Sequence, residues 1–175
     1  MNNLVEEILD LVDENDHVIG QKPRSAIYAE GLKNFRVVNA FVVNSEGKLW
    51  IPRRSAHKKL FPLGLDMSMG GHVESGESYD VAFGRELKEE LGLDAQHISY
   101  ALLGHLSPYQ DNVSAFMNVY EIKINDVPDY EKKDFTEYFW LTPQEVLNRL
   151  AHGEKAKDDL PRLIRIFYSE NSSEK

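Results

Sequence analysis

The sequence predicts an α/β fold, a sandwich in which a mixed β-sheet lies between helices. Strand-like and helix-like segments alternate along the chain instead of separating into blocks. Residues 36–43 form a nearly continuous apolar run, which is typical of a strand buried on both faces. The length of 175 residues corresponds to one domain, at about 150 residues per domain. We therefore expect a single domain over residues 1–175.

The first part of the chain predicts strands separated by turns. Asp13, Asn15 and Asp16 favour a turn directly after the first strand. The segment Asn44 to Gly47 favours a hairpin turn, and Pro62 with Gly64 marks residues 53–65 as a loop. We expect the strands, in chain order, at residues 8–12, 17–19, 36–43, 48–51 and 66–73.

The second part of the chain predicts three helices and three more strands. The first helix covers residues 78–91 and ends at Gly92, a residue that favours helix termination. Thr142 caps a helix over residues 143–150, and Pro161 begins another that runs to about residue 168. The strands are expected near residues 98–106, 113–124 and 137–141, and a polar tail follows at residues 169–175.

The composition excludes several classes of function. The chain contains no cysteine, which rules out disulfide scaffolds, cysteine-ligated metal sites and thiol nucleophiles. With 29 acidic and 20 basic residues the formal charge is −9, so we expect no nucleic-acid partner. The apolar stretches fall far short of the ~20 residues that span a bilayer, and residues 1–16 carry no basic residue, unlike a targeting peptide. These observations predict a cytoplasmic protein without a membrane partner and leave a homodimer open.

The expected helix at residues 78–91 carries a crowded acidic face. Glu86, Glu89 and Glu90 fall within one sector of the helix, because positions three and four apart are neighbours. Leu87 and Leu91 lie on the other face and can anchor it to a core. A solvated helix face is the ordinary interpretation of such a pattern. The alternative is a site for a hard cation such as Mg²⁺, which prefers carboxylate oxygens and substrate phosphates as ligands.

The segment 71–93 resembles the Nudix box, the signature of hydrolases that act on nucleoside diphosphates linked to another group. In that signature a glycine is followed by a glutamate, then by Arg-Glu, an aliphatic residue, a Glu-Glu pair, and a final glycine with an aliphatic residue. Every defined place is filled at the correct spacing, by Gly71, Glu77, Arg85, Glu86, Leu87, Glu89, Glu90, Gly92 and Leu93. The strand pattern on both sides also suits the Nudix α/β/α sandwich.

The resemblance implies a role for each of these polar positions. Glu86, Glu89 and Glu90 resemble the family's metal ligands, one of which acts as general base with a metal-bound water. Glu77 resembles an outer carboxylate that reaches the metal directly or through water, and Gly71 resembles the glycine whose carbonyl can bind metal. Arg85 resembles the arginine that orients the glutamates. The expected cofactor is Mg²⁺ or Mn²⁺, and the expected partner is a small organic diphosphate.

A wider pattern resembles the bacterial Nudix subfamily related to isopentenyl-diphosphate isomerases. It comprises the acidic turn 13–16, Arg36, Arg53, Arg54 and the segment 70–73. Isomerases of this fold need a cysteine close to the Gly-His pair, and here Gly70 stands at that place, before Gly71 and His72. We find no convincing second acid around residues 111–114 either. The sequence therefore favours hydrolysis over isomerisation.

The densest basic cluster lies just before the box. Arg53 and Arg54, with Lys58 and Lys59 nearby, are candidates to clamp the diphosphate of a substrate, because a guanidinium fork suits phosphate oxygens. A solvated loop is an equally weighted alternative, and Arg36 is the next candidate for the clamp. For His72 we favour a structural or substrate-contacting role over metal ligation.

Two functions of different classes remain open. The first is a divalent-metal-dependent pyrophosphohydrolase. The second is a binding module that keeps the fold and senses a phosphorylated metabolite without cleaving it. The complete set of glutamates favours the enzyme, because a sensor does not need crowded carboxylates.

Overall fold

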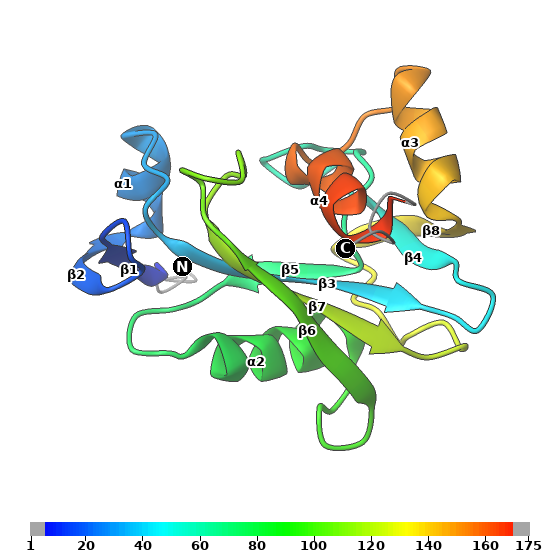
Figure 1. The fold of residues 1–175 in the computed structure, drawn as a ribbon, viewed down its shortest axis with the longest axis horizontal. Coiled ribbons are helices and arrows are strands. Elements are labelled where there is room, and N and C mark those ends of the chain that lie inside the picture. Colours follow the sequence, from blue (N-terminus) through cyan, green and yellow to red (C-terminus); the bar gives the residue numbers. More distant parts are fainter. Residues whose placement is uncertain (1–5, 170–175) are drawn as a thin grey trace, which may run out of the picture.

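A computed structural model describes residues 6–169 as one sheet-centred unit with a small hairpin beside it (Figure 1). The strands are β1 (Ile8–Val12), β2 (Val18–Pro23), β3 (Arg36–Val43), β4 (Leu49–Arg54), β5 (Met69–His72), β6 (Ser99–Leu106), β7 (Phe116–Lys123) and β8 (Phe135–Leu141). The helices are α1 (Arg24–Ala29), α2 (Tyr79–Leu91), α3 (Pro143–Ala151) and α4 (Asp159–Tyr168). Residues 170–175 of the expected polar tail lie outside the described residues.

The main sheet is mixed, as the sequence predicts. Its strands follow the order β6-β7-β3-β4-β8, and β5 pairs with β3 beside this path. The β3–β7 pair is parallel, whereas the other pairs in this sheet are antiparallel. The pairing of β5 with β3 places Gly71 opposite Val38 and Gly70 opposite Asn39. The glycine pair of the box is therefore fixed to the central strand.

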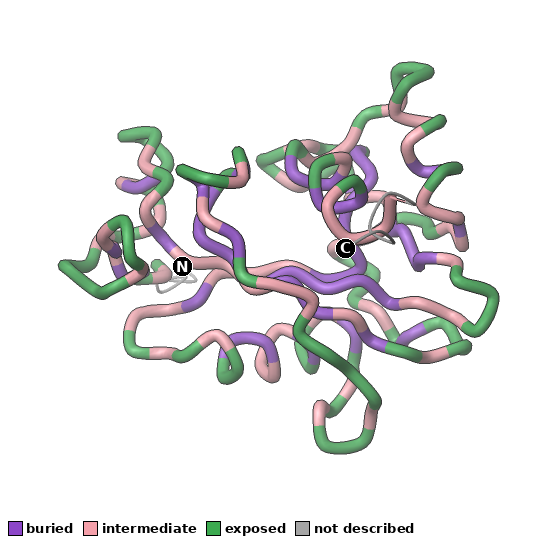
Figure 2. Tube along the Cα trace, viewed as in Figure 1, coloured by how far each residue is buried: buried purple, intermediate pink, exposed green. Residues whose placement is uncertain are grey.

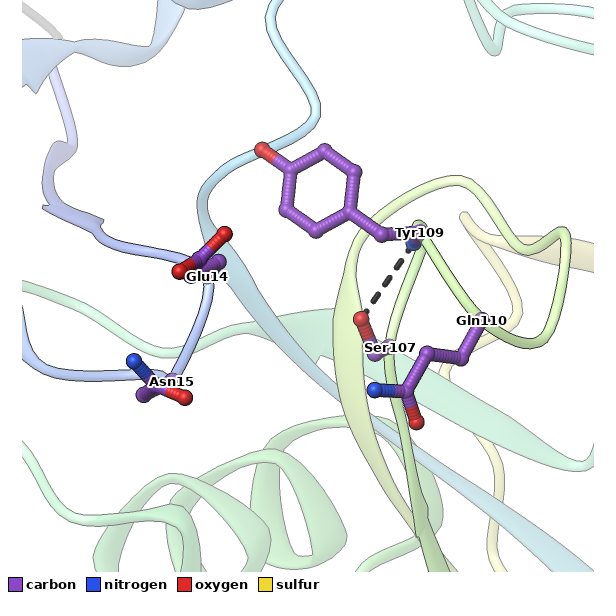
Figure 3. A pocket seen from close by; sticks show the side chains of 5 residues that line it. All are labelled: Glu14, Asn15, Ser107, Tyr109 and Gln110. Atoms are coloured by element: carbon purple, nitrogen blue, oxygen red, sulfur yellow. Dashed lines mark hydrogen bonds between the residues drawn. The ribbon is translucent and has the colours of Figure 1, made fainter.

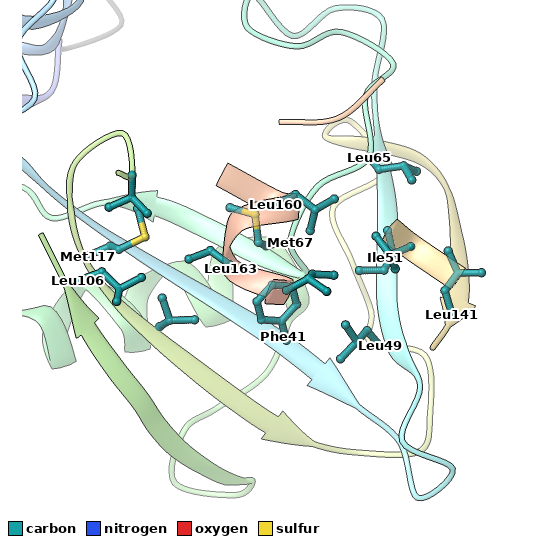
Figure 4. Close-up of a cluster of buried hydrophobic side chains, with 14 residues drawn as sticks. Phe41, Leu49, Ile51, Leu65, Met67, Leu106, Met117, Leu141, Leu160 and Leu163 are labelled. Carbon is teal, nitrogen blue, oxygen red and sulfur yellow. The ribbon is translucent and has the colours of Figure 1, made fainter. Parts of the chain in front are cut away.

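Helices cover both faces of the main sheet, with α2 on one face and α3 and α4 on the other (Figure 1). The side chains of β3 alternate between the two layers. Val38, Ala40 and Val42 join the core cluster that contains Phe83 and Leu87 of α2. Phe41 joins the opposite cluster with α4, which Figure 4 shows. This double burial explains the nearly continuous apolar run and the buried centre of the sheet in Figure 2.

The β1–β2 hairpin and α1 form a small layer next to the N-terminal end of β3. Leu9 and Ile27 pack with Phe35 in a third buried cluster. The acidic turn is present as predicted, because Asp13 Oδ1 accepts hydrogen bonds from the backbone N–H groups of Asn15 and His17, each at 2.9 Å. The sequence does not predict α1, a six-residue helix without a side-chain cap.

Three strands differ from their predicted bounds. β2 continues to Pro23 instead of ending at residue 19, because it pairs with β1 along its length. β4 continues to Arg54, where a loop was expected, because its last residues pair with β8. β5 begins only at Met69 rather than at residue 66. Between the diverging strands β3 and β4, the buried Ser68 hydroxyl donates to the Trp50 carbonyl at 2.6 Å and accepts from the Val42 N–H at 2.8 Å. Ser68 thus joins two strands through its side chain, and regular pairing starts after it.

The remaining elements agree with the prediction within a few residues. α3 has the expected Thr142 cap, with Glu145 completing a capping box. α4 begins at Asp159, two residues before the expected Pro161, and the buried Asp159 carboxylate accepts hydrogen bonds from the Ser114 N–H and hydroxyl groups. Within residues 6–169, none of the helices is long and apolar enough to cross a membrane.

Candidate metal and diphosphate site

Helix α2 carries the candidate ligands and is defined by local signals. The Ser78 side chain accepts a hydrogen bond from the Val81 N–H, and Gly92 ends the helix with a left-handed φ of 62°. Its apolar face is buried against the sheet through Ala82, Phe83, Leu87 and Leu91. At 100° per residue Glu86 and Glu90 lie beside this buried face rather than opposite it, so their carboxyl groups meet the glycines of β5.

Two of these glutamates are withdrawn from solvent beside the glycine pair. The Glu86 side chain is 13% exposed, and the Glu90 carboxylate accepts a hydrogen bond from the Gly70 N–H at 3.0 Å. Burial raises the pKa of Glu86 to about 6 and that of Glu90 to about 8. Repulsion from Glu89 adds to the shift of Glu86, and repulsion from Glu86 adds to that of Glu90. Glu89 differs, because its side chain is 60% exposed. The structure thus holds two carboxyl groups whose ionised forms are disfavoured by burial.

Arg85 connects the box residues to one another. Its guanidinium group donates to both carboxylate oxygens of Glu77 at 2.8 and 2.9 Å and to Glu86 at 2.7 Å. It also donates to the His72 carbonyl at 2.9 Å and lies 3.5 Å from Glu89. The Arg85 interaction holds the pKa of Glu77 below its usual value. These are the contacts that an orienting arginine needs.

Gly71 is required by the close approach of Glu86. All three atoms of the Glu86 carboxyl group lie within 2.5 Å of the point where a Cβ on Gly71 would stand. Any other residue at this position would displace the carboxylate. The carbonyl group of Gly71 as a metal ligand stays a prediction.

The described residues contain no group of three histidine, aspartate or glutamate side chains arranged to hold a metal ion. Glu86 is bonded to Arg85, and Glu90 is bonded to the Gly70 backbone, so the carboxylates point to different partners. The helix brings Glu86, Glu89 and Glu90 to one sector, as predicted. Joint ligation of a metal ion therefore requires at least one of these side chains to turn.

His72 lies in the hairpin layer rather than among the carboxylates. Its Nε2 is 3.0 Å from the Tyr28 hydroxyl, and its Nδ1 is 3.2 Å from Glu7. Its ring also packs against Phe35, and burial lowers the pKa of His72. Both ring nitrogens thus have protein partners, and the predicted contact of His72 with substrate stays a prediction.

The three arginines expected to clamp a diphosphate all have acidic partners in the protein. Arg36 pairs with Asp16 at 2.6 Å, and Arg54 pairs with the buried Asp66 at 2.5 Å. Arg53 bridges two carboxylates on separate elements, those of Glu137 and Glu154. In this structure the guanidinium groups therefore support strand ends and loops, and their binding of substrate stays a prediction.

Two features near the site were not expected from the sequence. Lys157, in the loop before α4, places its ammonium group 3.9 Å from the Asp66 carboxylate. A hollow of about 340 Å³ lies between the β1–β2 turn and the loop after β6 (Figure 3). It is lined by Glu14, Asn15, Ser107, Tyr109 and Gln110. Neither feature has a local sequence signal, because both join segments far apart in the chain.

Comparison with known proteins agrees with this arrangement. The model of the NUDIX domain matches residues 33–163. The chain is 63% identical over 163 residues to an uncharacterised Nudix hydrolase of Nostoc sp. (strain PCC 7120), covering 93% of this chain and 96% of that protein. The crystal structure of DR0079 from Deinococcus radiodurans superposes with a TM-score of 0.88 at 47% identity, covering 93% of this chain and 100% of that one.

The similarity to isomerases is more distant. An isopentenyl-diphosphate delta-isomerase of Paenarthrobacter aurescens is 25% identical over 154 residues, covering 86% of this chain and 84% of that protein. The predicted relation to isomerases is thus supported only by this distant similarity in sequence. The predicted α/β Nudix fold and the predicted enzyme class are confirmed. By its domain match, its relatives and its box, the chain belongs to the Nudix hydrolase family, a family of pyrophosphohydrolases.

Proposed function

We propose that this protein hydrolyses a diphosphate linkage in a nucleoside-diphosphate-type or other small organic diphosphate, with Mg²⁺ or Mn²⁺ as cofactor. The observation that carries the proposal is the pair of carboxyl groups, Glu90 and Glu86, that are withdrawn from solvent and held against Gly70 and Gly71. Such a pair is costly in a protein that has no cation to bind there, because burial and repulsion both oppose ionisation.

The donor set fits a hard divalent cation. Glu86, Glu89 and Glu90, with Glu77 and the Gly71 carbonyl, would hold it, and all of these donors are oxygen atoms. Burial raises the pKa of Glu86 and of Glu90, and a divalent cation bound to both would favour their ionised forms. When bound, the ion would polarise a diphosphate oxygen and lower the pKa of a water molecule.

The protein's own residues would supply positioning and proton transfer. Arg85 holds Glu77 and Glu86 through bonds of 2.7 to 2.9 Å, and so limits the rotation of both side chains. Glu86 or Glu90 would accept a proton from the attacking water, since a general base works best when its pKa lies near the working pH. The cation would also reduce the repulsion between an acidic protein and an anionic substrate.

Hydrolysis is tested with a panel of nucleoside-diphosphate derivatives and other organic diphosphates, with and without Mg²⁺ or Mn²⁺. We expect release of phosphate-containing products only with metal, and loss of this activity in Glu86→Gln. Glu46→Gln is the matched control, because Glu46 lies in the exposed β3–β4 turn and should keep full activity.

Two results would contradict the proposal. Binding of diphosphates without cleavage would indicate the alternative of a non-catalytic sensor. Isomerisation of isopentenyl diphosphate by the wild type would indicate an isomerase, although Gly70 provides no thiol. The cytoplasmic location, the absence of nucleic-acid and membrane partners, and a homodimer stay predictions from the sequence.

A further inference from the structure

Gly70 is surrounded by polar groups from three separate parts of the chain. A Cβ on Gly70 would stand 2.6 Å from Asn39 Oδ1 and 3.5 Å from Lys157 Nζ. The Gly70 N–H donates to the Glu90 carboxylate at 3.0 Å. The Lys157 ammonium group and the Glu90 carboxylate therefore flank the same glycine.

Lys157 differs from the other basic residues considered for this site, because it has no close ion pair. Within residues 6–169 its ion pair is with Asp66, at 3.9 Å, and Asp66 is already bonded to Arg54 at 2.5 Å. The Lys157 side chain is 28% exposed, so solvent reaches it. Its charge is available to an anion in a way that the charge of Arg54 is not.

The backbone holds Lys157 in place independently of its side chain. The Lys157 N–H donates to the Leu65 carbonyl at 2.9 Å, and the Lys157 carbonyl accepts from the Leu160 N–H at 3.1 Å. The Leu65 N–H in turn donates to the Lys155 carbonyl at 2.8 Å. These bonds fix the backbone of Lys157, from which the side chain reaches Gly70.

A second observation at the same place indicates a missing polar partner. Asn39 is only 2% exposed, and its Oδ1 has no hydrogen-bond partner among the described residues. The Asn39 Nδ2 group donates to Met117 Sδ at 3.5 Å, so only the amide oxygen lacks a partner, at a cost of about 1–3 kcal/mol. Because an amide oxygen only accepts hydrogen bonds, it calls for a donor, and the Lys157 ammonium group is a donor that lies beside the same glycine.

We infer that Lys157 binds the diphosphate group of the substrate next to Gly70, an inference that rests on the proposed function. A diphosphate lying across Gly70 would meet the ammonium group on one side and the α2 glutamates, with their cation, on the other. Lys157 would then supply the monovalent positive charge that the paired arginines do not.

The test measures binding of inorganic pyrophosphate with Mg²⁺ by titration calorimetry. We expect Lys157→Met to weaken binding by ten- to a hundredfold, because a charge-assisted hydrogen bond is lost. Lys157→Gln should behave like Lys157→Met, whereas Lys157→Arg should stay within about threefold of the wild type. Lys155→Met is the matched control: it removes the same charge from an exposed position two residues away and should change binding by less than about twofold.

Kinetics and salt dependence separate direct binding from a structural effect. In Lys157→Met, KM for the organic diphosphate should rise more than kcat falls, and the dependence of KM on salt should weaken. Pyrophosphate binding by Lys157→Met within twofold of the wild type, or an equal loss in Lys155→Met, would overturn the inference. A wild type that binds pyrophosphate through Lys157 but cleaves no diphosphate would refute only the proposed hydrolysis.

Discussion

A single methyl group at Gly71 tests whether the position of Glu86 controls the reaction. In Gly71→Ala the new Cβ would stand within 2.5 Å of all three carboxyl atoms of Glu86. Ordinary carbon contacts are about 3.5–4.0 Å, so the carboxyl group must retreat by at least about 1 Å. The backbone itself accepts alanine here, because Gly71 is not among the glycines with positive φ.

The expected effect is on turnover more than on folding. A displacement of about 1 Å in a reacting constellation costs roughly a hundredfold in rate, which corresponds to about 3 kcal/mol. The displaced carboxylate moves towards water, so the free energy of unfolding should change little. Steady-state assays with Mg²⁺ and thermal unfolding of the same preparations measure the two quantities.

Matched variants show whether the new contact is the cause. Gly84→Ala adds a methyl group on the same helix with no heavy atom within 4 Å of it, and it should raise stability by about 0.5–1 kcal/mol without loss of activity. If Gly71→Ala folds poorly, Gly71→Ala/Glu86→Ala should recover stability but not activity. A folded Gly71→Ala variant with wild-type kcat/KM would refute the reasoning.

Three further predictions concern the same region. Burial raises the pKa of Glu90 from 4.5 to about 8, so the folded metal-free protein retains a proton that the unfolded chain loses above pH 4.5. Its free energy of unfolding should therefore fall from about pH 5 to pH 8. In denaturant titrations of Glu90→Gln the fall above pH 6 should disappear, whereas a smaller fall below pH 6 should remain because the pKa of Glu86 is raised to about 6. Arg54→Ala leaves the buried Asp66 carboxylate without its 2.5 Å partner and should reduce the free energy of unfolding by about 2–3 kcal/mol. A raised KM at an unchanged free energy of unfolding would instead support binding of the diphosphate by Arg54. Gly70→Cys brings a Cβ to 2.6 Å from Asn39 Oδ1, so hydrolysis should fall, and NMR of the products should detect no isomerisation of isopentenyl diphosphate; isomerase activity in this variant would show that the pocket still suits that reaction.

The sequence predicts features whose causes lie within a few residues. The α2 helix depends on the Ser78 cap, the Gly92 terminus and an apolar face that repeats with the helical period. The run at residues 36–43 predicts β3 because burial on both faces leaves a local hydrophobic pattern. The box spacing places Glu86 and Glu90 on one side of the helix for the same geometric reason. These features belong to single elements, so the chain alone is sufficient to predict them.

Only the tertiary structure decides which charges are satisfied and which are free. In the sequence, Arg54 is an attractive phosphate ligand. In the fold, its guanidinium group forms an ion pair with Asp66, which follows the loop after β4. Lys157 has no distinguishing sequence pattern and becomes relevant because pairing with Leu65 places it beside Gly70. The sequence does not predict the α1 helix, because the helix is stabilised by the packing of Ile27 and not by a local cap. Ion pairing and burial depend on distances between segments far apart in the chain, and these distances exist only once the sheet and its helices have assembled.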